Sequence, residues 1–274
     1  MFQTRRINNA VVTPLQLNNQ HTPDQIYGYE FCTQPYATWL LCGKSRQGKG
    51  TAMYQILKHT IDPLMGTQVI IFSSTVHRDP LWEKTLELLE KKKCTVTCHA
   101  HFLLGKRGRE NILTELIAAM DEPEEPEEKD AEPPSGIVRP HHGHKKKVKN
   151  PTKVSSKWLI IFDDLPAQDM RNEALSFVMR NRHYKIKVIM SVQYLNMLMP
   201  GVRKQITNAV LFRSFSEEKL HSIYADLDIE IDFDKFCDLY RFATAEPYQF
   251  LQYDVHGNRW LKNFNEEISV QDVR

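Results

Sequence analysis

The sequence predicts an α/β fold in which helices cover both faces of a mostly parallel β-sheet. The first observation is a series of short, continuous apolar runs, such as residues 38–42 and 158–162, which are typical of buried strands. The second is that segments with a helical spacing of apolar residues follow several of these runs. Strands that alternate with helices pair in parallel, and a parallel sheet is covered on both faces.

Each element is expected from its own pattern. After the run at 38–42, apolar residues recur at helical spacing at Met53, Ile56 and Leu57. The same reasoning along the chain predicts helices at 51–60, 81–92, 111–120, about 171–182, 216–224 and 232–242. It predicts strands at 38–42, 68–72, 95–98, 158–162, 187–191, 209–213 and 249–253.

Length and composition limit the function classes. The chain has 274 residues, of which 41% are hydrophobic, so it can bury one large core. No apolar run approaches the roughly 20 residues that a membrane-spanning helix needs, and we expect no signal peptide. The five cysteines are scattered, which favours a reducing, cytosol-like compartment over a disulfide framework. The net charge of +2 gives no indication of a nucleic-acid partner.

Two segments differ from the rest in composition. Residues 1–36 are polar and without clear periodicity, and we interpret them as an N-terminal arm before a domain at 37–274. Residues 121–134 hold eight acidic residues and four prolines, and residues 139–153 hold six basic residues and three histidines. Such a stretch cannot bury enough apolar surface to offset its ordering entropy. We therefore expect a flexible insertion at 121–156.

A phosphate-binding motif follows the first predicted strand. The pattern G-x-x-x-x-G-K begins at Gly43 and ends at Lys49, between an apolar strand and a helix, which is the context that this motif requires. Its backbone N–H groups and the helix N-terminus attract phosphate, and Lys49 would reach the β- and γ-phosphates. The sequence therefore predicts an ATP site made by Gly43, Lys44, Ser45, Arg46, Gln47, Gly48, Lys49, Gly50 and Thr51.

One position departs from the usual motif. The serine or threonine that normally follows the lysine and contacts Mg²⁺ is replaced by Gly50, with Thr51 next. One further residue along a helix means a rotation of about 100° and a rise of about 1.5 Å. Thr51 is thus expected either to hold Mg²⁺ through water or to stabilise the loop only.

Two later strand ends supply candidate catalytic groups. The run at 158–162 ends in Asp163 and Asp164. We expect Asp163 to hold Mg²⁺ and Asp164 to orient and deprotonate the attacking water. About 30 residues later a third apolar strand ends near Gln193, whose amide can read the γ-phosphate or hold the water. An Asp-Asp turn that opens a loop is the structural alternative for the two aspartates.

These residues together resemble a family. Residues 38–255 are similar to the genome-packaging ATPases of large DNA viruses, within the FtsK/HerA superfamily. The resemblance is carried by segments 163–165, 182–195, 200–213 and 245–248. It implies a RecA-like P-loop NTPase fold, a homo-oligomeric ring, ATP and Mg²⁺ as cofactors, and translocation of double-stranded DNA into a capsid. It also implies a capsid or portal protein as a further partner, and a location in the host cytoplasm, the viral factory or the virion.

The same resemblance implies an arginine that acts on a neighbouring subunit's site. Arg182 is the best match, and Arg203 and Arg213 are alternatives. A fixed guanidinium would stabilise the charge that builds on the γ-phosphoryl oxygens in the transition state. A surface ion pair is the alternative interpretation of each arginine.

Other functions stay open on the sequence alone. Residues 48–51 also resemble the loop of adenylate kinases, so a nucleoside monophosphate kinase is one alternative, although such kinases do not need the aspartate pair. A nucleotide-binding interaction protein with weak turnover is another.

Cys94, Cys98, His99 and His101 have some potential as a zinc site, but alternation along a strand separates the cysteines from the histidines. The lysines at 145–153 would either contact DNA phosphates or balance the acidic half of the insertion.

Overall fold

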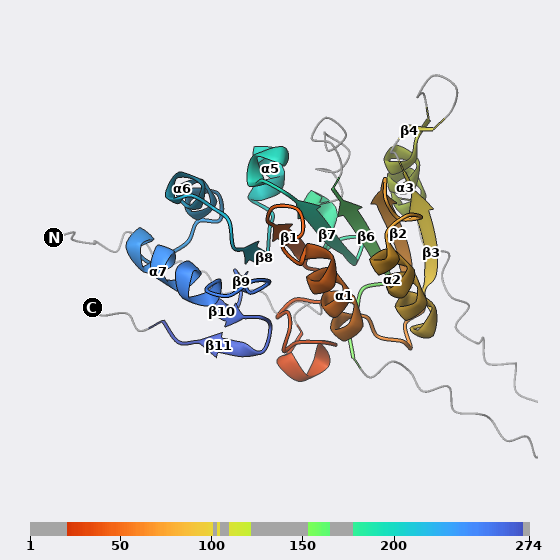
Figure 1. Ribbon diagram of the computed structural model, residues 1–274. Coiled ribbons are helices and arrows are strands. Elements are labelled where there is room, and N and C mark those ends of the chain that lie inside the picture. The colour runs from red at the N-terminus through yellow and green to blue at the C-terminus, as the bar shows by residue number, and fades with distance from the viewer. Residues whose placement is uncertain (1–20, 101–102, 105–109, 122–152, 165–177, 271–274) are drawn as a thin grey trace, which may run out of the picture.

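A nine-stranded sheet forms the centre of the molecule in the computed structural model, which describes residues 21–100, 103–104, 110–121, 153–164 and 178–270 (Figure 1). The strand order is β11-β10-β9-β8-β1-β7-β6-β2-β3. Six neighbouring strands pair in parallel: β1 (Thr38–Cys42), β2 (Gln68–Ser73), β3 (Thr95–His99), β6 (Trp158–Asp163), β7 (Ile186–Val192) and β8 (Asn208–Phe212). The fold class predicted from the sequence is confirmed.

Strand β7 occupies a central position in the sheet. It lies between β1 and β6 and pairs in parallel with both. The phosphate motif follows β1 and the two aspartates end β6. Because parallel strands end at the same edge, β7 brings its own carboxyl end between these two groups.

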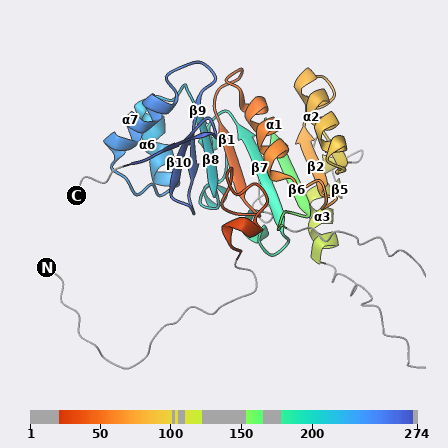
Figure 2. The ribbon, with the colours of Figure 1, turned by 90° about the horizontal axis from the view of Figure 1, so that it is seen from below.

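Helices cover both faces of the sheet. The helices α1 (Lys49–Thr60) and α2 (Pro80–Lys91) lie side by side on one face (Figure 2). The opposite face carries α3 (Ile112–Asp121), α5 (Pro200–Arg203), α6 (Glu217–Asp226) and α7 (Phe233–Ala243).

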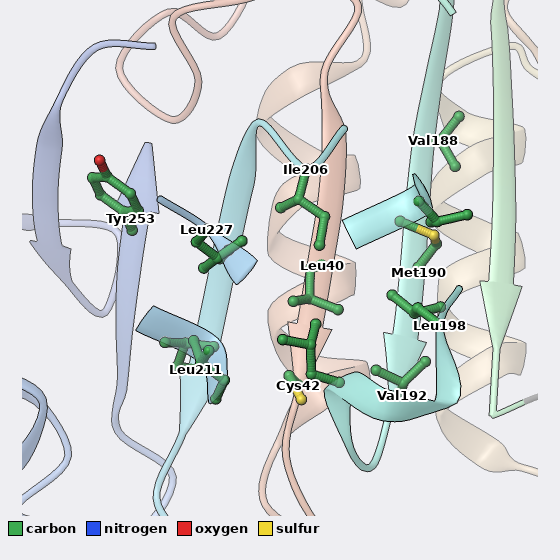
Figure 3. Close-up of a cluster of buried hydrophobic side chains, with 14 of the residues drawn as sticks. Leu40, Cys42, Val188, Met190, Val192, Leu198, Ile206, Leu211, Leu227 and Tyr253 are labelled. Atoms are coloured by element: carbon green, nitrogen blue, oxygen red, sulfur yellow. The ribbon is translucent and has the colours of Figure 1, made fainter. Parts of the chain in front are cut away.

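Alternation along the strands divides the buried side chains between two cores. Leu40 and Cys42 of β1 join the core under α5, α6 and α7, which Figure 3 shows together with Met190 of β7. Trp39 and Leu41 point to the other face and pack with α1 and α2. Both faces are thus apolar, which explains why these strands read as continuous apolar runs in the sequence.

The remaining strands extend the sheet in antiparallel fashion. β9 (Phe250–Asp254) pairs with β8, and β10 (Arg259–Lys262) and β11 (Glu266–Ile268) follow as a meander. Before β1, residues 21–36 contain the short 3₁₀ helix η1 (Pro23–Gln25). The Thr33 hydroxyl donates to Asp254 Oδ1 at 3.0 Å, which ties this segment to β9.

Most predicted elements have their observed counterparts. The predicted strand at 249–253 is β9, but it is antiparallel, and the short β10 and β11 were not expected. Two further short strands, β4 (Leu103–Leu104) and β5 (Glu110–Asn111), and the 3₁₀ helix η2 (Leu195–Met197) were also missed.

Two expectations fall largely outside the described residues. Of the helix expected at about 171–182, the structure describes residues from 178 on, and 178–180 are helical. Of the insertion expected at 121–156, residues 122–152 lie outside the described part. At its end, Val154 forms a parallel bridge with Ile26 and Ser155 is buried. In the described parts of the chain, no helix is long and apolar enough to cross a membrane.

Candidate nucleotide-binding site

The phosphate motif forms a tight turn between β1 and α1, visible at the end of β1 in Figure 1. Gly48 has a φ of 103°, a left-handed conformation that strains any residue with a side chain. A Cβ placed on Gly43 would lie 2.7 Å from Cβ of Phe212, so the loop passes directly over β8. Both glycines are therefore required by the backbone path, and the turn leads into the N-terminus of α1, where N–H groups remain unpaired.

Lys49 is almost buried at the first position of α1, with 7% exposed. Its ammonium donates to the carbonyl oxygens of Gly43 at 2.9 Å and Lys44 at 3.4 Å. It also lies 3.7 Å from Asp164 Oδ1. A cation at the positive end of a helix is unfavourable on its own, so this arrangement suits an anion bound in the loop.

The carboxyl end of β7 connects the two predicted halves of the site. The Gly43 N–H donates to the Val192 carbonyl at 3.1 Å, and the Asp164 N–H donates to the Ser191 carbonyl at 3.1 Å. Gln193 follows directly and is half-buried. The loop, the aspartates and the glutamine therefore meet at one edge of the sheet, while Asp164 itself has a left-handed φ of 46°.

Asp163 lies in a cluster of oxygens and one indole. Its Oδ2 accepts from the Trp82 Nε1 at 3.2 Å and from the Ser73 hydroxyl at 3.4 Å. In register it faces Ser73 on β2 and Ser191 on β7. Burial raises the pKa of Asp163, and the neighbouring Ser191 hydroxyl opposes this effect. A carboxylate among hydroxyl oxygens fits a Mg²⁺ ion, which prefers oxygen ligands.

Gly50 has a steric explanation in the packing of α2. A Cβ on Gly50 would lie 2.4 Å from Cδ2 of Leu81 and could be accommodated only if that side chain moved. The first turn of α2 therefore occupies the space beside the position where other phosphate loops carry a hydroxyl. Thr51, one residue further, is exposed.

The three candidate arginines occupy different places. Arg182 lies before the amino end of β7, at the edge of the sheet opposite to the phosphate loop, with Nη2 2.9 Å from His256 Nε2. Arg203 forms a half-buried ion pair with Asp226 at 3.0 Å. Arg213 follows β8 on the loop side and donates to the Ala245 carbonyl at 2.9 Å. Arg203 thus has an intramolecular partner that accounts for it.

The cysteine–histidine group shows the expected alternation. Cys98 and His99 are successive residues of β3, and the ring of His99 stacks on Phe72. His101 is not among the described residues. Within the described ranges, no group of three or more His, Cys, Asp or Glu side chains is placed to hold a metal.

Sequence reasoning missed Ser73, Trp82 and Tyr248 as neighbours of the site. Ser73 ends a strand beside β6, and this proximity depends on the strand order. Trp82 reaches Asp163 across a separation of 81 residues. Tyr248 stands beside Gly48 of the phosphate loop. Two signals were available: Ser73 and Tyr248 each lie near the end of a predicted element, and Tyr248 belongs to segment 245–248, which carries part of the family resemblance.

Part of the chain matches a known family. Residues 140–245 match the family described as Poxvirus A32 protein. This range contains Asp163, Asp164 and Gln193 and begins after the phosphate loop. No curated protein sequence matches the chain.

Solved structures with the same fold include two of viral packaging enzymes. The DNA-packaging ATPase B204 from Sulfolobus Turreted Icosahedral Virus has 16% sequence identity and a TM-score of 0.52, over 86% of this chain and 99% of that chain. The genome packaging NTPase B204 from Sulfolobus turreted icosahedral virus 2, in complex with sulfate, has 18% identity and a TM-score of 0.50, over 84% and 96%. The chain is therefore similar to the poxvirus A32 family over residues 140–245 and shares the fold of these two enzymes, in line with the resemblance that the sequence indicated.

Proposed function

We propose that this protein is an ATPase that hydrolyses ATP to move double-stranded DNA into a viral capsid. The observation that carries the proposal is the meeting of Lys49 and Asp164, 3.7 Å apart, at the end of a strand that leads into Gln193. A phosphate-binding cation, a candidate base and an amide at one strand edge are the groups that phosphoryl transfer to water requires. The match to the poxvirus A32 family and the fold shared with the Sulfolobus virus enzyme support the packaging role.

Each residue of the site has a separate role in this proposal. Lys49 exchanges its carbonyl partners for the β- and γ-phosphates, and the loop amides hold the same oxygens. Asp163, with the hydroxyls of Ser73 and Ser191 beside it, would hold Mg²⁺, which supplies neutralisation of phosphate charge when bound. Asp164 accepts the proton of the attacking water, and Gln193 orients that water.

The assembly is inferred from where the arginines lie. In a head-to-tail ring, the nucleotide site and the group that completes it lie on different surfaces of a subunit. Arg182, at the opposite edge of the sheet from the phosphate loop, suits a role in the neighbour's site. Arg213, beside its own loop, suits a role within the subunit. We therefore propose a homo-oligomeric ring with Arg182 as the trans residue, acting on DNA at a capsid or portal protein in infected-cell cytoplasm.

The first experiment measures phosphate release from ATP with and without double-stranded DNA. We expect turnover that DNA stimulates and that added nucleoside monophosphates do not change. Transfer of phosphate to a monophosphate would instead identify a kinase. Binding of ATP without turnover under either condition would identify a nucleotide-dependent interaction protein.

The second experiment tests the ring. Arg182→Ala subunits should bind ATP normally but hydrolyse it about 10³–10⁵ times more slowly, because the guanidinium acts in the transition state. Mixing them with Lys49→Ala subunits should restore part of the activity, since some composite sites then keep both groups. Arg213→Ala should give no such recovery. Mixed oligomers that stay inactive would refute the trans role of Arg182.

A further inference from the structure

The strand order determines the direction in which a nucleotide lies in the loop. In the proposed function Lys49 and Asp164, which are 3.7 Å apart, hold the γ-phosphate end on the side of β1 where β7 and β6 lie. The end that carries the base must leave the loop away from Asp164. That is the side of β8 and β9.

An exposed aromatic side chain stands on that side. Tyr248, in the turn between α7 and β9, is 69% exposed. Among the exposed large hydrophobic residues in the described part of the chain, this is the largest fraction. A Cβ on Gly48 would lie 3.7 Å from Tyr248 Cδ1 and 3.5 Å from Phe212 Cε1. The tyrosine thus borders the phosphate loop itself, with Phe212 beneath the loop.

The turn that presents Tyr248 is held from both sides. Arg213 donates to the Ala245 carbonyl at 2.9 Å, and the Glu246 N–H donates to Gln249 Oε1 at 3.1 Å. Tyr248 itself has a φ of 65°, a left-handed conformation that is unfavourable for an aromatic residue. The ring stays mostly exposed although its backbone is held in a left-handed conformation, a combination that is found at ligand-binding sites.

We propose that Tyr248 stacks on the base of the bound nucleoside triphosphate. The proposal rests on the proposed function, because it assumes that the loop binds the phosphates. Stacking on a ring face tolerates any base, since every base has a π-face, and it does not require the tyrosine hydroxyl. The site would therefore recognise the base as a planar group, and Arg213 would act as a positioning residue for the turn.

The test separates the base from the phosphates by calorimetric titration with ATP and with inorganic tripolyphosphate. Tyr248→Ala should weaken ATP binding by about 5- to 150-fold, the range that loss of one base–aromatic stack gives. It should leave tripolyphosphate binding unchanged, and Tyr248→Phe should bind ATP like the wild type. Phe242→Ala is the matched control, because Phe242 is 59% exposed and its ring lies under Lys262.

Three results would overturn the proposal. Equal ATP affinity of Tyr248→Ala and wild type would show that the ring does not contact the base. Equal weakening of ATP and tripolyphosphate would show that Tyr248 supports the phosphate loop instead. In both cases loss of binding in Lys49→Ala would leave the proposed function standing, whereas wild-type protein that binds neither ligand would refute both.

Discussion

A buried lysine lies at each end of helix α1: Lys49 is its first residue, and Lys187 of β7 contacts its C-terminus. The two ammonium groups differ in their hydrogen-bond partners. Lys49, at the N-terminus, contacts two loop carbonyls and lies near Asp164, at the helix end that repels a cation. Lys187 of β7 is 2% exposed and donates to the Thr60 carbonyl at 2.8 Å, at the C-terminus, where a cation is favoured. The first lysine can gain a better partner in a phosphate, and the second already has its partner. In the proposed function, the N-terminal end of the helix therefore binds a ligand, whereas the C-terminal end has a structural role.

Of the two ends of α1, the N-terminal end is expected to show the larger effect on ATP binding. Lys49→Ala removes charge-assisted contacts to two phosphates, so ATP affinity should fall by about 10²–10⁴ and turnover with it. Binding is measured by calorimetry, with circular dichroism to verify the fold. Lys58→Ala, which changes an exposed lysine of the same helix, serves as the control. Unchanged turnover in Lys49→Ala would refute the phosphate-loop assignment.

A second substitution tests the partner of Lys49. Asp164→Asn should keep ATP bound but slow hydrolysis by about 10²–10⁴, because an amide cannot accept a proton from water. Single-turnover phosphate release with pre-bound ATP measures this step. A loss of affinity with unchanged turnover per bound ATP would indicate a role in metal binding or structure instead.

A third test concerns the missing hydroxyl at the same helix end. Gly50→Ser alone requires Leu81 to move, since the new Cβ would lie 2.4 Å from its Cδ2. In the double variant with Leu81→Ala, the serine hydroxyl should become a further Mg²⁺ ligand and lower the Mg²⁺ concentration for half-maximal ATP binding by about five-fold. Leu81→Ala alone is the control. An unchanged Mg²⁺ requirement would mean that position 50 does not face the metal.

The effect expected at the C-terminal end concerns stability and not binding. Burial lowers the pKa of Lys187 to about 8 from 10.5. The charged form is thus disfavoured in the folded state, a penalty that is fully present below pH 8 and disappears as pH rises to 10.5. Relative to Lys187→Met, the free energy of unfolding of the wild type should rise by up to about 3 kcal/mol across this window.

Denaturant titrations at several pH values measure this difference, with Lys58→Met as the exposed control. Cys32 lies near Lys187, and burial raises its pKa to about 12, so in both proteins it stays a thiol in the folded state across the window. A wild type and variant whose stabilities change in parallel would show that Lys187 is not held in an environment that disfavours its charge. ATP affinity at pH 7 should not differ between the two.

The sequence predicts short-range features of this protein well. The turn from Gly43 to Lys49 and the run that ends in Asp163 are contiguous patterns, and each specifies its own strand and turn. What could not be predicted depends on strand order, which contiguous patterns do not encode. The contact of Trp82 with Asp163 requires the start of α2 to reach the end of β6, and the approach of Leu81 to Gly50 requires α2 to lie beside α1. The antiparallel β10 and β11 are short strands with little apolar signal.

The pairing of β7 with both β1 and β6 has a mechanical consequence. Its seven residues span about 23 Å without a loop, from the turn after Arg182 to Gln193. Hydrogen bonds on both sides attach it to β1 and β6, so it cannot stretch and can shift only together with its neighbours. At its carboxyl end it holds the backbones of Gly43 and Asp164 at once. A force applied to β7 at the Arg182 end would therefore displace the phosphate loop and the candidate base Asp164 together.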